Sequence, residues 1–164
     1  MGKSKNILIL GLGNIGRRHL EAILKLRDIR INLIDNNEIS LNLSKKIIYQ
    51  KNKFNLDINF FNKITEITEK IDLCIIATNS MDRTELILKL INSFSIKYLI
   101  VEKVVFNKIS DFDKIIKKLN YKKIKSWVNY SRRYDNQFKK IKNDINNIDK
   151  IYIEVNGGRW GLGS

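Results

Sequence analysis

The sequence has 164 residues, of which 43% are hydrophobic, and no apolar run approaches the length of a membrane span. A chain of this length buries one good core and at most the start of a second. The formal net charge of +14 comes from lysines spread among many Asn and Ile residues, so charge alone is a weak argument for nucleic-acid binding.

A glycine-rich turn near the N-terminus is the most informative segment. An apolar run over residues 7–10 leads into Gly11-Leu12-Gly13-Asn14-Ile15-Gly16, which has the G-x-G-x-x-G spacing of a dinucleotide pyrophosphate site. Gly11 would make the tight turn, Gly13 would let the backbone approach the pyrophosphate, and Gly16 would let the next helix pack close to the sheet. The helix N-terminus then offers free N–H groups to the phosphates.

The segments that follow supply the context that this motif requires. Residues 14–27 have apolar side chains at near-helical spacing, and residues 30–35 are typical of a second strand that ends in an acid. Asp35 lies about 20 residues after the last glycine, where a carboxylate accepts hydrogen bonds from the adenosine ribose hydroxyls. The alternative is a glycine-rich turn of another α/β protein, with Asp35 as a simple turn residue.

Strand and helix patterns alternate in the middle of the chain. The patterns predict a helix over 38–51, a strand over 56–61, a weak helix over 64–68 and a strand over 71–78. The last strand contains Cys74, the only cysteine, which we expect to be a core residue of a cytoplasmic protein.

The same alternation continues with a long amphipathic helix over 81–94 and a strand over 98–101 that leads into Glu102 and Lys103. Ser110 is the expected N-cap of a helix over 111–119. The densest basic segment, residues 114–125, covers this helix and its exit, and a solvated face is favoured there over a phosphate-contacting patch.

The last predicted elements are a strand over 124–129, a helix over 131–146 and an alternating strand over 150–156. Trp127 and Trp160 are candidate core aromatics. The whole pattern predicts an α/β protein with a doubly wound parallel sheet, a Rossmann fold, and helices on both faces.

Four segments in order resemble the glucose–fructose oxidoreductase, inositol dehydrogenase and MocA family. They are the glycine turn extended to His19, Ala77-Thr78-Asn79-Ser80 in place of the family's A-T-P-N loop, Glu102-Lys103-Val104 in place of its E-K-P motif, and residues 128–135, which resemble the entry into a second domain. The resemblance implies an NAD(P)-binding Rossmann domain at 1–127 and the start of a truncated α+β substrate or dimerisation domain at 128–164. It also implies an oxidoreductase that moves a hydride between a nicotinamide cofactor and a carbon of a sugar, nucleotide sugar or cyclitol.

The resemblance assigns cofactor contacts to residues at the strand ends and assigns no metal ligand. These residues are Gly11, Gly13, Asn14, Ile15 and Gly16 for the pyrophosphate, Asp35 for the adenosine ribose, Thr78, Asn79 and Ser80 along the cofactor, Glu102 beside the nicotinamide, and Arg133 toward the nicotinamide or substrate. Asn36 and Asn37 follow Asp35, with no arginine to pair with a 2′-phosphate, so NAD is favoured over NADP.

Lys103 is the candidate catalytic residue. Removal of a hydride from a carbinol carbon requires loss of the hydroxyl proton, and a lysine can stabilise the developing alkoxide or take that proton. The alternative is a surface lysine at a strand end in a lysine-rich chain. His19, the only histidine, is expected to pack or hydrogen-bond to a neighbouring loop.

Two departures from the family pattern leave alternatives open. The chain has no proline, so Asn79 and Val104 stand where the family motifs have one. Family enzymes also complete their site with an acidic residue and a histidine from the second domain, so we expect the 164-residue chain alone to be a weak or inactive catalyst. The open alternatives are a fragment of a longer enzyme, a homo-oligomer or half-enzyme completed by another chain, and a non-catalytic NAD-binding or interaction module from a truncated gene. The expected partner is a small sugar-type substrate, with no membrane and no nucleic acid.

Overall fold

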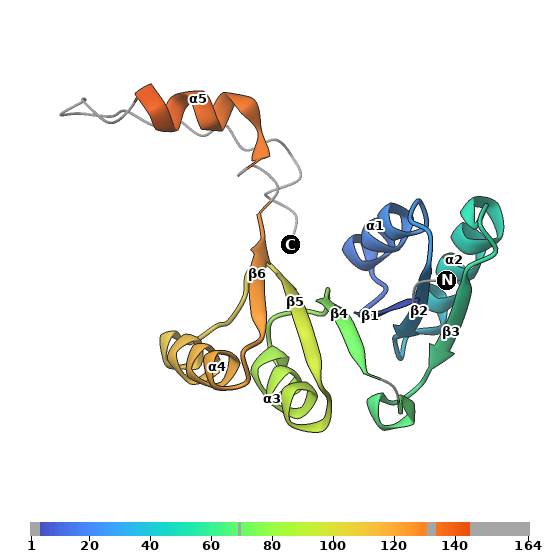
Figure 1. Ribbon diagram of the computed structural model, residues 1–164, viewed down its shortest axis with the longest axis horizontal. Helices are drawn as coiled ribbons and strands as arrows, with labels where there is room; N and C mark the ends of the chain where they lie inside the picture. The colour runs from blue at the N-terminus through green and yellow to red at the C-terminus, as the bar shows by residue number, and fades with distance from the viewer. Residues whose placement is uncertain (1–3, 69, 131–133, 145–164) are drawn as a thin grey trace. The chain divides into compact units, whose positions relative to one another are not determined.

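The computed structural model describes residues 4–68, 70–130 and 134–144. The chain divides into two units, Met1–Asn129 and Tyr130–Ser164. The first unit contains, in chain order, β1 (Lys5–Leu10), α1 (Asn14–Ile23), β2 (Ile29–Ile34), α2 (Glu38–Lys51), β3 (Asp57–Phe61), the 3₁₀ turn η1 (Ile64–Glu66), β4 (Ile71–Ile76), α3 (Arg83–Ser93), β5 (Ile96–Glu102), α4 (Ile109–Tyr121) and β6 (Lys125–Asn129) (Figure 1). The described part of the second unit contains α5 (Asn136–Asp144).

The strands of the first unit form one parallel sheet in the order β3-β2-β1-β4-β5-β6. The chain winds outward from β1 to β3, returns to the middle, and winds outward in the other direction from β4 to β6. The strand order therefore reverses between β1 and β4. In open α/β sheets ligands bind at such a reversal, outside the carboxyl ends of the strands. The predicted doubly wound α/β fold is confirmed.

The central strands are buried on both faces because alternate side chains meet different helices. Leu8 and Cys74 pack in the cluster that includes α3 and α4, whereas Ile9 and Ile75 pack in the cluster that includes α1 and α2. Figure 1 shows these two helix pairs on opposite sides of the sheet. Cys74 has no exposed surface, as expected for a core residue.

The structure corrects several predictions about the elements. Helix α4 begins at Ile109 with Lys108 at its N-cap, so Ser110 lies inside the helix. The helix predicted over 64–68 is only the turn η1. Trp127 is 45% exposed, because its strand β6 lies at the edge of the sheet with few neighbours to cover it.

Other boundaries shift by a few residues. Helix α1 ends at Ile23, so that Leu26 is exposed, and β5 begins two residues earlier than predicted. The described part of the helix predicted over 131–146 is α5. The strand predicted over 150–156 and Trp160 lie outside the described residues.

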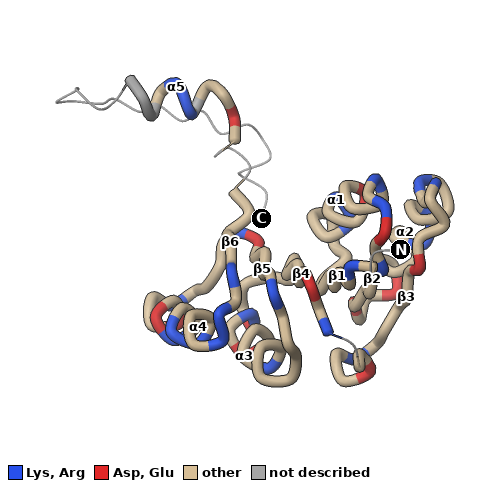
Figure 2. Tube along the Cα trace, viewed as in Figure 1, with Lys and Arg blue, Asp and Glu red and all other residues tan. Residues whose placement is uncertain are grey.

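In the described part of the chain, basic side chains are spread over several elements and mixed with acidic ones. Figure 2 shows both charge signs on α4, where Asp111 and Asp113 precede the lysines. In the basic segment 114–125 most lysines are exposed, and Lys114 lies 3.5 Å from Glu85 of α3. None of the helices in the described part of the chain is long and apolar enough to cross a membrane.

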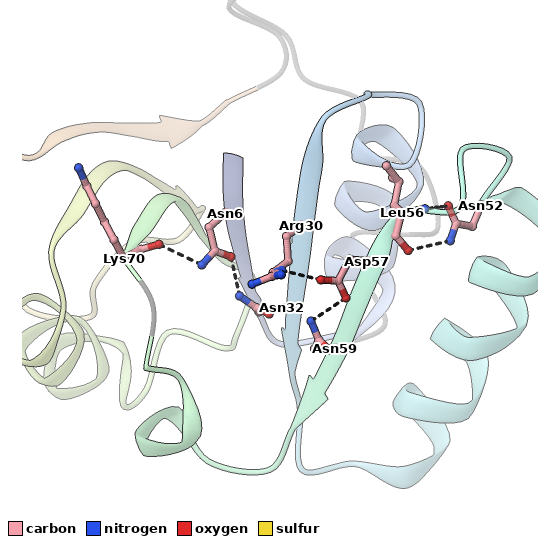
Figure 3. Close-up of polar contacts among 8 residues, drawn as sticks. All are labelled: Asn6, Arg30, Asn32, Asn52, Leu56, Asp57, Asn59 and Lys70. Atoms are coloured by element: carbon pink, nitrogen blue, oxygen red, sulfur yellow. Dashed lines mark hydrogen bonds and ion pairs between the residues drawn. The ribbon is translucent and has the colours of Figure 1, made fainter. Parts of the chain in front are cut away.

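A polar network links the amino-terminal parts of the strands. Asn6 of β1 is 7% exposed, donates from Nδ2 to the Lys70 carbonyl at 3.0 Å, and accepts at Oδ1 from Nδ2 of Asn32 at 2.6 Å (Figure 3). Nearby, Arg30 pairs with Asp57 across β2 and β3 at 2.5 Å. Buried amides must be hydrogen-bonded, and this network meets that requirement between neighbouring strands.

Candidate functional site

A cavity of about 560 Å³ lies at the carboxyl ends of β1, β2 and β4, where the strand order reverses. Its walls come mainly from the glycine turn after β1, residues 35–37 after β2 and residues 77–79 after β4. The predicted cofactor residues that line it are Gly11, Gly13, Asp35, Thr78 and Asn79. The fold therefore brings together three motifs that are far apart in the sequence.

The three glycines of the turn occupy different surroundings. Gly11 has a φ of +85°, and a Cβ there would lie 2.8 Å from the Thr78 nitrogen. A Cβ at Gly16 would lie 1.8 Å from the Gly11 carbonyl oxygen, which no side chain can accommodate without a shift of the turn. A Cβ at Gly13 would meet no atom within 4 Å. The turn thus needs Gly11 and Gly16 for its own packing and leaves open space beside Gly13.

Helix α1 begins directly after this open space. Gly13 is its N-cap, and no side chain caps the helix or places an acid in its first turn. The N–H groups of a first turn are suited to an anionic acceptor such as a phosphate. Arg17 braces the turn by donating to the Leu12 carbonyl at 2.7 Å and to Oδ1 of Asn14 at 2.6 Å.

Asp35 connects the end of β2 to the glycine turn. Its Oδ2 accepts from the Leu12 N–H at 2.5 Å and its Oδ1 accepts from the Asn37 N–H at 2.8 Å. Each carboxylate oxygen can accept a second hydrogen bond, so the half-buried carboxylate can still bind hydroxyl groups in the cavity. Asn37 in turn caps α2 by accepting from the Ser40 N–H at 2.9 Å.

A second cluster lies at the ends of β5 and β6. Glu102 is buried, with 7% of its surface exposed. Its carboxylate accepts a hydrogen bond from Asn129 Nδ2 at 2.5 Å and lies 2.6 Å from Nε2 of His19 in α1. His19 thus hydrogen-bonds to the last residue of strand β5 rather than to a loop, the partner that the sequence predicted as one of its two alternatives. Lys103 follows as an exposed residue outside the lining of the cavity, and the Lys103–Val104 peptide bond is cis.

Arg83 is a buried residue near the site that the sequence motifs do not point to. It is the first residue of α3 and is 2% exposed. Its guanidinium donates to carbonyl oxygens of Thr78, Glu102, Val104 and Val105. Burial lowers the pKa of Arg83, and the Glu102 carboxylate opposes that change. The one hint in the sequence is an arginine at a helix start in a chain whose basic residues are mostly lysine.

The remaining predicted site residues lie outside the cavity lining. Asn14 and Ile15 are exposed on the first turn of α1, Gly16 is buried beneath the turn, and Ser80 is half-buried after β4. Arg133 lies outside the described residues. Within the described ranges, no group of three or more His, Cys, Asp or Glu side chains could hold a metal ion.

These features fit a dinucleotide. The open space beside Gly13 and the uncapped start of α1 suit a pyrophosphate, and the Asp35 carboxylate at the end of the second strand suits ribose hydroxyls. A Cβ at position 13 would occupy space that the protein itself leaves empty.

Residues 5–130 match the sequence profile of the Gfo/Idh/MocA family, described as an oxidoreductase family with an NAD-binding Rossmann fold. The chain belongs to this family. The matched segment runs from β1 to the residue after β6, so it contains every strand of the sheet described above. The predicted family and the predicted cofactor, NAD, are confirmed.

Solved structures of several dehydrogenases have a similar fold. Scyllo-inositol dehydrogenase from Lactobacillus casei, with bound NAD(H) and scyllo-inositol, is 20% identical and superposes with a TM-score of 0.68 over 87% of this chain. Myo-inositol 2-dehydrogenase from Lactobacillus plantarum is 20% identical, with a TM-score of 0.67 over 88% of this chain. The WlbA dehydrogenase from Bordetella pertussis, in complex with NADH and UDP-GlcNAcA, is 15% identical, with a TM-score of 0.70 over 87% of this chain.

This chain covers only part of each of those proteins: 41% of the Lactobacillus casei enzyme and 42% of each of the other two. At these identities the likeness shows the fold alone. None of the curated proteins matches the sequence.

Proposed function

We propose that this chain forms the cofactor-binding part of an NAD-dependent dehydrogenase that acts on a hydroxyl-bearing or keto carbon of a sugar, nucleotide sugar or cyclitol. The observation that carries the proposal is the cavity that joins the glycine turn, Asp35 and the loop after β4. The inositols and the UDP-sugar bound or used by structural relatives support the substrate class.

In this proposal the protein binds the cofactor from three sides. The first turn of α1 donates N–H groups to the pyrophosphate, with Gly13 allowing close approach. Asp35 accepts from the adenosine ribose hydroxyls, and its negative charge disfavours a 2′-phosphate, which makes NAD the better ligand than NADP. Thr78 and Asn79 border the cofactor after β4.

The chemical step is assigned to Lys103. A bound nicotinamide ring would exchange a hydride with the substrate carbon. The amine of Lys103, at the carboxyl end of β5, would hold the proton of the substrate hydroxyl and stabilise its oxygen as charge develops. Glu102, fixed by His19 and Asn129, keeps the segment that carries Lys103 in place.

A titration of the purified chain with NADH and NADPH tests the cofactor assignment. We expect saturable quenching or enhancement of NADH fluorescence and at least about tenfold weaker binding of NADPH, the effect of one unfavourable charge contact. Asp35→Asn removes the negative charge, so it should reduce the difference between NADH and NADPH affinity. Absence of NADH binding up to the millimolar range would contradict the proposal.

The substrate class is tested by following NAD⁺ reduction with a panel of inositols, hexoses and UDP-sugars. With any substrate found, Lys103→Met should lower kcat by about 10²- to 10⁴-fold, as expected for loss of a general acid–base group, while NADH affinity stays unchanged. An unchanged kcat in this variant would exclude Lys103 from the chemistry.

A further inference from the structure

Arg83 is a buried cation at a position that disfavours positive charge. It is 2% exposed and begins helix α3, where the helix dipole and the unpaired N–H groups repel a cation. Burial of a guanidinium carries a further cost, and Arg83 Nε has no hydrogen-bond partner among the described residues. The contacts of the other two guanidinium nitrogens must compensate these costs.

Those contacts all go to backbone carbonyl oxygens, which belong to two separate segments: the loop after β4, and the end of β5 with the residues that follow it. Nη2 donates to Thr78 in the loop after β4. Nη1 donates to Glu102 at 2.5 Å and Val105 at 3.2 Å, and also to Val104. Hydrogen bonds from a charged donor are stronger than neutral ones. A single planar group therefore joins a loop that lines the cavity to the segment that carries Lys103.

Two of the four carbonyls that Arg83 binds, those of Glu102 and Val104, belong to the residues immediately before and after Lys103. Glu102 is held at its carbonyl by Arg83 and at its carboxylate by Asn129 and His19. Val104 is held at its carbonyl by Arg83. The backbone of Lys103 is thus fixed on both sides, although its own side chain is exposed.

We propose that Arg83 is a positioning residue that holds the backbone of residues 102–105, which carries Lys103, beside the loop after β4 and so shapes the nicotinamide end of the site. The inference deepens the proposed function and rests on it. A lysine at this position would keep the positive charge but not the two separate donor nitrogens. A single ammonium group cannot donate to carbonyls of both segments as the planar guanidinium does.

The test compares NADH with ADP-ribose, which has the pyrophosphate and both riboses but lacks nicotinamide. In Arg83→Lys we expect NADH affinity to fall about tenfold, the effect of one lost well-placed contact. ADP-ribose affinity should change less than about threefold, since the glycine turn and Asp35 remain intact. An equal loss of affinity for NADH and ADP-ribose, or no loss of affinity for either, would overturn the proposal.

Asn6→Ala is the matched control for destabilisation alone. It breaks buried hydrogen bonds to Lys70 and Asn32 near the amino-terminal ends of the strands (Figure 3). We expect this variant to melt at a lower temperature and to keep the wild-type ratio of NADH to ADP-ribose affinity. If Asn6→Ala showed the same selective loss of NADH affinity, general destabilisation would explain the effect of Arg83→Lys, and the proposal would be refuted.

Hydrogen–deuterium exchange of the unmodified protein supplies a readout that needs neither a folded variant nor a bound cofactor. Amides of residues 79–82 and 103–106 should exchange as one cooperative unit, because Arg83 ties both segments together. Independent exchange of the two segments would overturn the proposal. Failure of the wild-type protein to bind NADH, in contrast, would refute the proposed function and leave this exchange result to decide the role of Arg83.

Discussion

At the scale of single residues, the glycines of the turn have different roles: Gly11 and Gly16 allow close packing, and Gly13 borders the space for a ligand. Gly13 has backbone angles that any residue can adopt, φ −60° and ψ −169°, and its missing Cβ borders open space. Gly13→Ala should therefore fold with a loss of only about 0.5 kcal/mol, the difference in N-cap preference. Its methyl group would occupy the approach to the pyrophosphate, so NADH affinity should fall about tenfold or more. Thermal melts and NADH titrations measure the two effects.

Gly16→Ala is the matched comparison, since the same methyl group there meets the Gly11 carbonyl at 1.8 Å. We expect a loss of about 1–3 kcal/mol in the free energy of unfolding, as for other overpacked positions, together with weaker NADH binding. Urea unfolding of both variants checks the contrast. Equal stability of the two alanine variants would show that the turn relaxes around Gly16 and that the distinction is wrong.

At the scale of the elements, helix starts show which caps contribute to stability. Asn37 caps α2 through a 2.9 Å bond from the Ser40 N–H, whereas Ser110 lies one residue inside the start of α4. Asn37→Ala should lower the free energy of unfolding by about 1 kcal/mol, as for other lost N-caps. Ser110→Ala should change it by less than about 0.5 kcal/mol, as for other surface substitutions. Urea titrations of the two variants decide this, and a larger loss in Ser110→Ala would contradict the assignment of the caps.

The same elements show how far the sequence predicts this fold. The bounds of α2 were predicted correctly at 38–51, because the signals that place it are local. The start of α4 was predicted wrongly, because Ser110 is a good N-cap by type and only packing of Ile115 and Leu119 on the sheet fixes where the helix begins. Trp127 was assigned to the core because hydrophobicity alone does not reveal an edge strand.

For the site, the sequence predicted the residues whose spacing is local and missed the ones that act across the sheet. Gly11, Gly13 and Asp35 line the cavity as members of one motif. Arg83 could not be predicted in its observed role, because its partners are backbone carbonyls as far away as Val105. Backbone acceptors leave no pattern of residue types, so only the folded arrangement reveals them.

At the scale of the whole molecule, the parallel sheet makes the middle of the chain the best protected part. β4 lies between β1 and β5, and helices on opposite faces cover the two halves of the sheet. The charged residues lie mainly outside this core, and both signs occur on α4 (Figure 2). A net charge of +14 gives a general attraction for anions.

Cys74 lies on β4 with no exposed surface, so its reaction with a thiol reagent reports on opening of the parallel sheet. Burial raises the pKa of its thiol, so the reactive thiolate forms only when the sheet opens. For a domain stable by 5 kcal/mol or more, labelling by a disulfide reagent such as DTNB should be at least about a thousandfold slower than in the unfolded chain. NADH at about 100 times its Kd should slow labelling about a hundredfold further, since it binds only the folded state.

A Ser126→Cys variant supplies the comparison for this labelling experiment, because position 126 is exposed on the edge strand β6. One equivalent of thiol should then react at once, and Cys74 should react as slowly as before. Fast labelling of Cys74 in the unmodified protein would mean that β4 opens locally, without unfolding of the sheet. In that case the loop after β4, which carries Thr78 and contacts Arg83, would move independently of the loop that carries Lys103.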